Sequence, residues 1–189
     1  MRPEERQTFI KDLRHALSVA GLNMEAWVVL TDHDSRSRHL RAMNGYSIFF
    51  QTSINAHFVG MLIPFYRLYE NRSDTFNIPR LLKELRESGA LPTEKLDELD
   101  GKYAAIRPLW VKLSILRNKA FGHCNAVLTL REIFGQAAIS QNQFREFFDK
   151  TKDLLNTLTL ALRHEAHAFN LGSGDSLNRM LEDLGRVRE

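Results

Sequence analysis

The sequence predicts an all-α helical bundle, with two long antiparallel core helices and shorter peripheral ones. Apolar residues recur at steps of three and four along most of the chain, and no strand alternation persists anywhere. Proline stands at several expected helix starts, and glycine stands near several expected ends. With 189 residues, 43% of them hydrophobic, the chain is long and apolar enough for one real core. We therefore expect a single domain over residues 1–172, followed by a polar tail helix over residues 173–189.

The first quarter of the chain divides into several expected elements. A helix begins at Pro3 and is expected to stop at Gly21, with one apolar face made by Phe9, Leu13, Leu17 and Ala20. Asn23 is a candidate cap for a short helix over residues 24–30, and residues 31–35 are polar enough for a connection. From about Ser37 we expect one long helix as far as Glu70, with a bend near Gly60 and Pro64.

This long helix raises a membrane question, because residues 42–66 contain no acidic or basic side chain. The stretch nevertheless holds too many polar and helix-breaking residues for a lipid-facing helix: Asn44, Gln51, Asn55, His57, Gly60 and Pro64. We therefore expect a buried or partner-covered helix and no membrane association. Its uncharged polar stripe of Asn44, Ser47, Gln51 and Asn55 faces an interface or a site, or is simply a less apolar flank.

The remaining elements have clearer helix start and stop signals. Residues 71–74 indicate a turn, and Pro79 precedes a short helix over residues 80–87 that ends at Ser88 and Gly89. A long helix begins near Thr93 and is expected to kink at Pro108. Residues 124–136 predict a connection with a helical turn around 130–134. A final long helix runs from Ser140 to about Leu162, and a tail helix is expected over residues 176–184.

The stretch from Leu113 to Cys124 is the most informative one in the chain. Arg117 occupies a position where the helical stripe of Ile106, Trp110, Leu113, Ala120 and Cys124 calls for an apolar residue. Because the opposite side is also apolar, at Leu109, Val111, Ile115 and Leu116, the helix is expected to be largely surrounded by protein. An arginine there needs an anionic or hydrogen-bonding partner.

Lys119 and His123 add to this stretch. A turn at Gly122 would bring the imidazole of His123 toward Arg117, and the set suits the handling of a phosphate group. The alternative is that Arg117 and Lys119 are interface or surface charges and that His123 is a charge at the end of a helix.

The segment Arg117-Asn118-Lys119-Ala120-Phe121-Gly122-His123 resembles the R-x(4–6)-H motif of the HEPN superfamily, with five residues between Arg and His. The upstream segments 65–70 and 78–82 are similar to a bacterial branch of that superfamily, the abortive-infection AbiU type. The resemblance covers roughly residues 50–162.

The resemblance implies a metal-independent endoribonuclease, toxin-like and active in phage defence, whose cleft is shared by the two chains of a homodimer. In that reading the 2′-hydroxyl of RNA is the nucleophile and His123 is the general acid or base. Arg117 holds the scissile phosphate, and Asn118 orients His123 or the phosphate. Lys119 and Arg67 are candidate substrate-binding residues. Neither a cofactor nor a metal is expected, and the products are a 2′,3′-cyclic phosphate and a 5′-hydroxyl.

Two further classes of function stay open. The same fold serves as a non-catalytic RNA- or protein-binding module, including toxin–antitoxin forms that pair with an antitoxin or a nucleotidyltransferase. The second class is a structural bundle in which Arg117 pairs with a carboxylate such as Glu70 or Glu132.

Bulk properties and minor motifs narrow the choice between these classes of function only slightly. A net charge of +3 permits an RNA partner without arguing for one. A single cysteine, Cys124, excludes an internal disulfide and fits a reducing compartment. The charged N-terminus is not a leader peptide, so a cytoplasmic location is expected. The His- and Asp-containing segments 32–34 and 163–167 lack the convergent ligands of a metal site.

Overall fold

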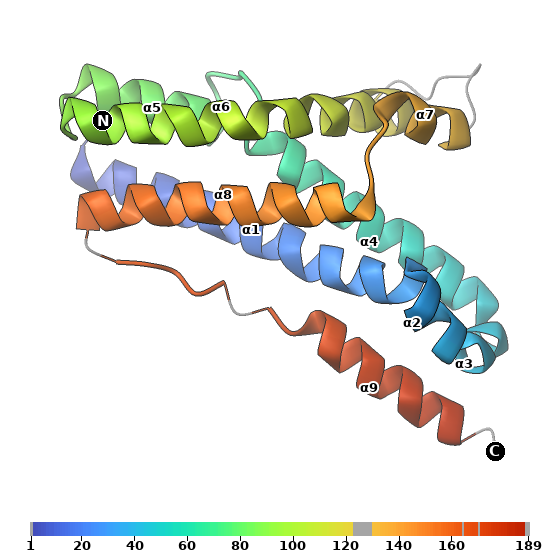
Figure 1. Ribbon diagram of the computed structural model, residues 1–189. Helices are drawn as coiled ribbons and strands as arrows, with labels where there is room; N and C mark the ends of the chain where they lie inside the picture. Colours follow the sequence, from blue (N-terminus) through green and yellow to red (C-terminus); the bar gives the residue numbers. More distant parts are fainter. Residues whose placement is uncertain (1, 123–129, 164, 170, 188–189) are drawn as a thin grey trace.

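The computed structural model describes residues 2–122, 130–163, 165–169 and 171–187. Its elements are helices joined by short turns and by longer segments, such as residues 68–77 between α4 and α5 (Figure 1). Their bounds are α1 Pro3–Thr31, α2 His33–Arg38, α3 Leu40–Gly45, α4 Ser47–Arg67, α5 Ile78–Glu87, α6 Thr93–Leu116, η1 Arg117–Gly122, α7 Leu130–Ala137, α8 Gln141–Arg163 and α9 Ser173–Arg186. The described residues contain no strand, and the predicted all-α class is confirmed.

The prediction that Gly21 ends the first helix is wrong, because α1 continues through it to Thr31. Gly21 is instead a place of close approach between helices. A Cβ atom there would lie 2.6 Å from Cε2 of Phe148 and 2.8 Å from Cδ1 of Leu171. The side chain of Asn23 likewise caps nothing, since its amide donates to the carbonyl of Val19 within the same helix. Tertiary packing, and not a helix end, accounts for the glycine.

The single long helix expected over residues 37–70 is also wrong, because the structure divides this stretch into α2, α3 and α4. Asp32 begins α2 by accepting hydrogen bonds from the backbone N–H groups of Asp34 and Ser35. Breaks follow at His39 and at Tyr46, whose φ of −134° and ψ of 44° are not helical. α4 itself runs without a break through Gly60 and Pro64.

Of the described helices, α4 is long and apolar enough, by length and composition alone, to cross a membrane. It is also part of the bundle, because it packs along α1 and buries Phe50, Phe58, Met61, Leu62 and Phe65. Only 28% of its most apolar window is buried, so α4 keeps a broad uncharged surface outside the core.

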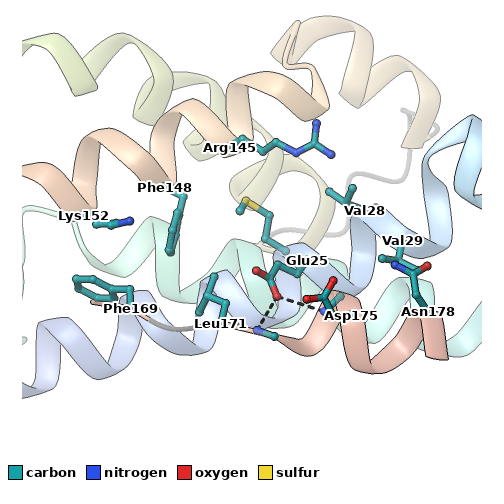
Figure 2. A pocket seen from close by; sticks show the side chains of 13 residues that line it. Glu25, Val28, Val29, Arg145, Phe148, Lys152, Phe169, Leu171, Asp175 and Asn178 are labelled. Atoms are coloured by element: carbon teal, nitrogen blue, oxygen red, sulfur yellow. Dashed lines mark hydrogen bonds between the residues drawn. The ribbon is translucent and has the colours of Figure 1, made fainter. Parts of the chain in front are cut away.

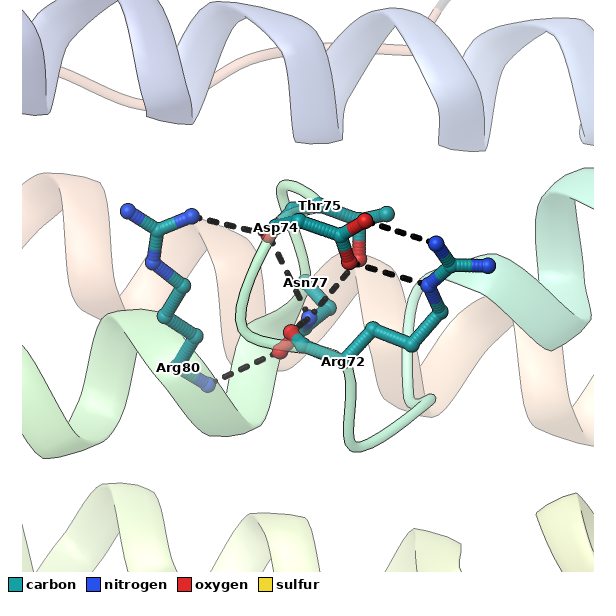
Figure 3. Close-up of polar contacts among 5 residues, drawn as sticks. All are labelled: Arg72, Asp74, Thr75, Asn77 and Arg80. Atoms are coloured by element: carbon teal, nitrogen blue, oxygen red, sulfur yellow. Dashed lines mark hydrogen bonds and ion pairs between the residues drawn. The ribbon is translucent and has the colours of Figure 1, made fainter.

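The loop between α4 and α5 is ordered by one buried side chain, that of Asn77 (Figure 3). Its Oδ1 accepts from the backbone N–H of Arg80 at 2.9 Å and thereby caps α5. Its Nδ2 donates to the carbonyl of Arg72 at 2.7 Å and to both oxygens of Thr75. An ion pair between Arg72 and Asp74 closes the turn on the outside. The predicted turn and the predicted helix after it are confirmed.

The main core lies between α1, α4, α6 and α8. α6 and α8 lie side by side and run in opposite directions (Figure 1). The ring of Phe147 packs edge-on against those of Phe65 and Tyr69. The hydroxyl of Tyr69 lies 2.9 Å from Oγ1 of Thr151, which itself donates to the carbonyl of Phe147. Burial raises the pKa of Tyr69 far above its ordinary value.

The tail helix α9 begins at Ser173, packs against α1 and α3, and follows an extended segment (Figure 1). Its apolar side contributes Leu177, Leu181 and Leu184 to a second, smaller core with Leu30, Ala42, Met43 and Phe50. Glu25 of α1 holds the start of the helix, since its carboxylate accepts from the backbone N–H groups of Gly172 and Gly174 at 3.0 and 3.2 Å. Figure 2 shows these contacts at the edge of a cavity of about 640 Å³ between α1, α8 and α9.

Candidate functional site

The end of α6 changes its helical pitch at the residue that the sequence singles out. The backbone N–H of Arg117 points to both Leu113 and Ser114 carbonyls, and residues Arg117–Gly122 then form a π-helix. The wider turn of a π-helix occurs mostly as a short insertion and often at functional sites. Arg117 is therefore placed at a junction between two helical geometries.

Arg117 is half-buried, and an aromatic ring is its main neighbour. Its guanidinium carbon lies 4.7 Å from the centroid of the Tyr66 ring, a cation–π distance. Its Nη1 donates to Oδ1 of Asn118 at 3.0 Å. Within the described residues no ion pair joins Arg117 to Glu70, to Glu132 or to another carboxylate. The partners of Arg117 are thus an aromatic face and an amide, and neither of them neutralises its positive charge.

Tyr66 and Trp110 form an aromatic shelf beneath this arginine. Their rings are stacked, with centroids 5.9 Å apart and an interplanar angle of 24°. Nε1 of Trp110 also donates to the backbone carbonyl of Tyr66 at 3.2 Å in the last turn of α4, and the backbone N–H of Tyr69 donates to the same oxygen. The shelf therefore ties the end of α4 to α6.

Sequence reasoning did not assign a role in the site to Tyr66 or Trp110. The available signal was the spacing of Trp110 and Arg117, which are seven residues and about two turns apart on one stripe. The third member comes from α4, where the family resemblance pointed to the neighbouring Arg67 and not to Tyr66.

The other predicted site residues lie in different environments. Asn118 is exposed and positions Arg117 through its side-chain oxygen. Lys119 is half-buried, and its ammonium group donates to Oε1 of Gln136 on α7. Arg67, next to Tyr66, forms an ion pair with Asp12 of α1 and does not join the Arg117 cluster. His123 lies outside the described residues, as does Cys124.

One side of α6 departs from the expectation that protein surrounds it. Leu109 and Leu116 are buried as expected, whereas Val111 is 45% exposed. Trp110 and Ile115 are half-buried against the core. The surface around the end of α6 is consequently accessible, and Arg117 lies at the boundary between that surface and the core.

The arrangement has a definite chemical capability. A permanently charged, planar guanidinium rests on an aromatic ring, with an exposed amide beside it and an ammonium group on the same short π-helix. Such a set suits an anionic ligand, because phosphate oxygens match the fork of its N–H donors.

A family comparison agrees with this helical architecture. The family model HEPN_AbiU2, described as AbiU2, matches residues 4–180. The chain therefore belongs to the AbiU2 family of the HEPN superfamily, whose name ties it to defence-related, abortive-infection HEPN domains. No curated protein and no solved structure has a significant match to the chain.

Proposed function

We propose that this protein is a metal-independent endoribonuclease of the HEPN type that acts in phage defence inside the cell. The observation that carries the proposal is the cation of Arg117, held on Tyr66 and Asn118 without a carboxylate partner among the described residues. A charge kept partly out of water without neutralisation suits a site that receives an anionic ligand.

The proposed reaction uses the nucleophile that RNA carries itself. The 2′-hydroxyl attacks the adjacent phosphorus as its proton passes to a base, and the 5′-oxygen leaves with a proton from an acid. His123 supplies one of these roles in each protomer, and Arg117 offsets the charge that develops on the phosphoryl oxygens. Asn118 orients the guanidinium, and Lys119 adds positive potential for the strand. The products are a 2′,3′-cyclic phosphate and a 5′-hydroxyl.

The uncovered face of α4 supports the dimer that this mechanism requires. It runs from Ile48, 82% exposed, through Ile63, 39% exposed, to the aromatic shelf at Tyr66. The residues between them on that face are small or uncharged: Thr52, Asn55, Ala56 and Val59. Because the face ends at Tyr66, a two-fold contact in which the two α4 helices lie parallel would bring two Arg117 sites near one another.

The dimer is tested by molar mass in solution. We expect Ile48→Glu to convert a dimer to a monomer and to reduce any RNA cleavage in parallel. Leu160→Glu is the matched control, since Leu160 is 47% exposed on α8, away from this face. Equal masses for wild type and both variants would contradict the role of α4.

The function is tested by cleavage of RNA in EDTA. We expect wild type to cut, and Arg117→Ala and His123→Ala to lose at least a hundredfold in rate, about the effect of removing one electrostatic or acid–base group. Arg107→Ala, an exposed arginine on the same helix, should keep wild-type activity. Folded, dimeric wild type that leaves varied RNAs intact would refute the ribonuclease proposal and favour a non-catalytic module that binds an antitoxin, a nucleotidyltransferase or RNA.

A further inference from the structure

A second cationic region lies at the other end of the bundle from Arg117. It consists of two adjoining cavities, of about 230 and 440 Å³, between the first turns of α1 and the C-terminal end of α8. They share Gln7, Ile10 and Arg163. Because α6 and α8 run in opposite directions, Arg163 at the end of α8 is far from Arg117 at the end of α6 (Figure 1).

The lining of these cavities is strongly basic. Arg6 lines the smaller cavity, Lys11 and Arg14 line the larger one, and Arg163 lines both. Only one carboxylate, that of Glu165, is among the lining residues, and it lies 3.4 Å from Nη2 of Arg163. Four cations therefore face one anion, before any charge on the exposed imidazoles of His15 and His167 is counted.

Two of these arginines hold buried donors that nothing in the described structure satisfies. Nε of Arg6, and both Nε and Nη2 of Arg14, are buried and have no hydrogen-bond partner. Burial lowers the pKa of Arg14; Glu165 partly restores it, and Arg163 lowers it further. A guanidinium that has lost water without gaining an acceptor is costly, whereas an anion in the cavity would offset that cost.

The shape of the site limits the class of anion. The larger cavity falls within the volume range of small-molecule sites, roughly 300 to 1,000 Å³. Its donors are guanidinium forks and an amide, which match phosphate oxygens better than a lone ammonium group would. The apolar side chains of Ile10 and Leu162 form the wall beside them and would contact the organic part of a ligand.

We propose that Arg6, Arg14 and Arg163 form a phosphate-binding site that takes a phosphate-bearing ligand of nucleotide size. Arg14 and Arg6 supply half-buried guanidinium groups, and Arg163 supplies an exposed one at the mouth. The phosphate can belong to a free anion, to a mononucleotide or to an RNA strand, and the three sources share this chemistry. The site is separate from the Arg117 motif and does not depend on ribonuclease activity.

The test is calorimetric titration of the full-length protein with pyrophosphate, with 5′-AMP and with a short single-stranded RNA, at constant ionic strength. We expect saturable binding of at least one probe. The pair Arg6→Gln and Arg14→Gln should weaken it by at least tenfold, about the loss expected for charge-assisted hydrogen bonds. The control pair Arg38→Gln and Arg107→Gln removes the same charge from exposed positions outside the cavities and should leave the affinity unchanged.

Thermal unfolding gives a second test, in which Arg14→Met affects the melting temperature in opposite directions without and with the ligand. Without ligand, Arg14→Met should raise the melting temperature, because it removes a buried and unsatisfied charge. The same variant should lose the rise that the bound probe causes in wild type. Binding of the RNA alone, lost in the Arg6 and Arg14 pair, would assign the site to an RNA strand.

Several outcomes would overturn the proposal. They are the absence of saturable binding by all three probes, equal weakening by the control pair, and a melting temperature that falls in Arg14→Met with the ligand response intact. The titration measures binding of the probes and not their cleavage, so a failure of the cleavage test leaves this measurement unaffected.

Discussion

The stacking of Arg117 on Tyr66 has a measurable energetic consequence. A cation over an aromatic ring contributes about 0.5–1 kcal/mol at exposed sites and about 2 kcal/mol when it is desolvated. Arg117 is half-buried at 4.7 Å from the ring centroid, so we expect a coupling of about 1 kcal/mol between the two side chains.

A double-mutant cycle isolates that coupling. Tyr66→Leu also removes the stacking on Trp110, and Arg117→Met also removes the hydrogen bond to Asn118. These separate losses cancel in the cycle if each single variant removes no other shared contact. Free energies of unfolding are measured by urea denaturation followed by circular dichroism, with the slope m checked for each variant.

One control variant keeps the aromatic ring of Tyr66, and a second control cycle removes the charge of a different arginine. Tyr66→Phe retains the aromatic face and should change the coupling by less than about 0.5 kcal/mol. A cycle between Tyr66→Leu and Arg107→Met should be additive, since Arg107 is exposed elsewhere on α6. Additivity of Tyr66→Leu and Arg117→Met within about 0.3 kcal/mol would refute the assigned role of the ring.

Three further predictions test the bundle itself. Thr151→Val should destabilise the protein by about 1–3 kcal/mol, because it leaves the buried hydroxyl of Tyr69 without a partner. Combining it with Tyr69→Phe should recover part of that loss. Additive effects of the two substitutions in urea denaturation would contradict this. Glu25→Gln should weaken the docking of α9 by about 1 kcal/mol and increase limited proteolysis between α8 and α9. Unchanged proteolysis would show that the carboxylate does not hold the helix. Burial lowers the pKa of His57 below its ordinary value of 6.5, so the unfolded chain takes up the proton first as the pH falls. The free energy of unfolding should therefore decrease below that value, and a wild-type pH profile in His57→Gln would be inconsistent with this assignment.

Two of the expectations that failed concerned the end of the first helix. Gly21 and Asn23 are typical of a helix boundary, but tertiary contacts use both inside α1. Gly21 allows Phe148 and Leu171 to approach, and Asn23 accepts a hydrogen bond from Nδ1 of His57 at 3.0 Å. Gly60 of α4 also lies at a close contact between helices, since a Cβ there would lie 2.6 Å from Oδ1 of Asn23. Glycine at a close contact and glycine at a helix end look alike in a sequence.

The helical class, the end of α5 at Ser88 and the unusual position of Arg117 follow from the sequence alone, because periodicity and helix-stop signals depend on residues within a few turns. Only the tertiary structure decided what Arg117 contacts, because Tyr66 comes from a helix 51 positions earlier in the chain. The same holds for the ion pair between Arg67 and Asp12, 55 positions apart, and for the buried donors of Arg14. Side chains meet across helices according to how the helices pack, and no local pattern records that packing.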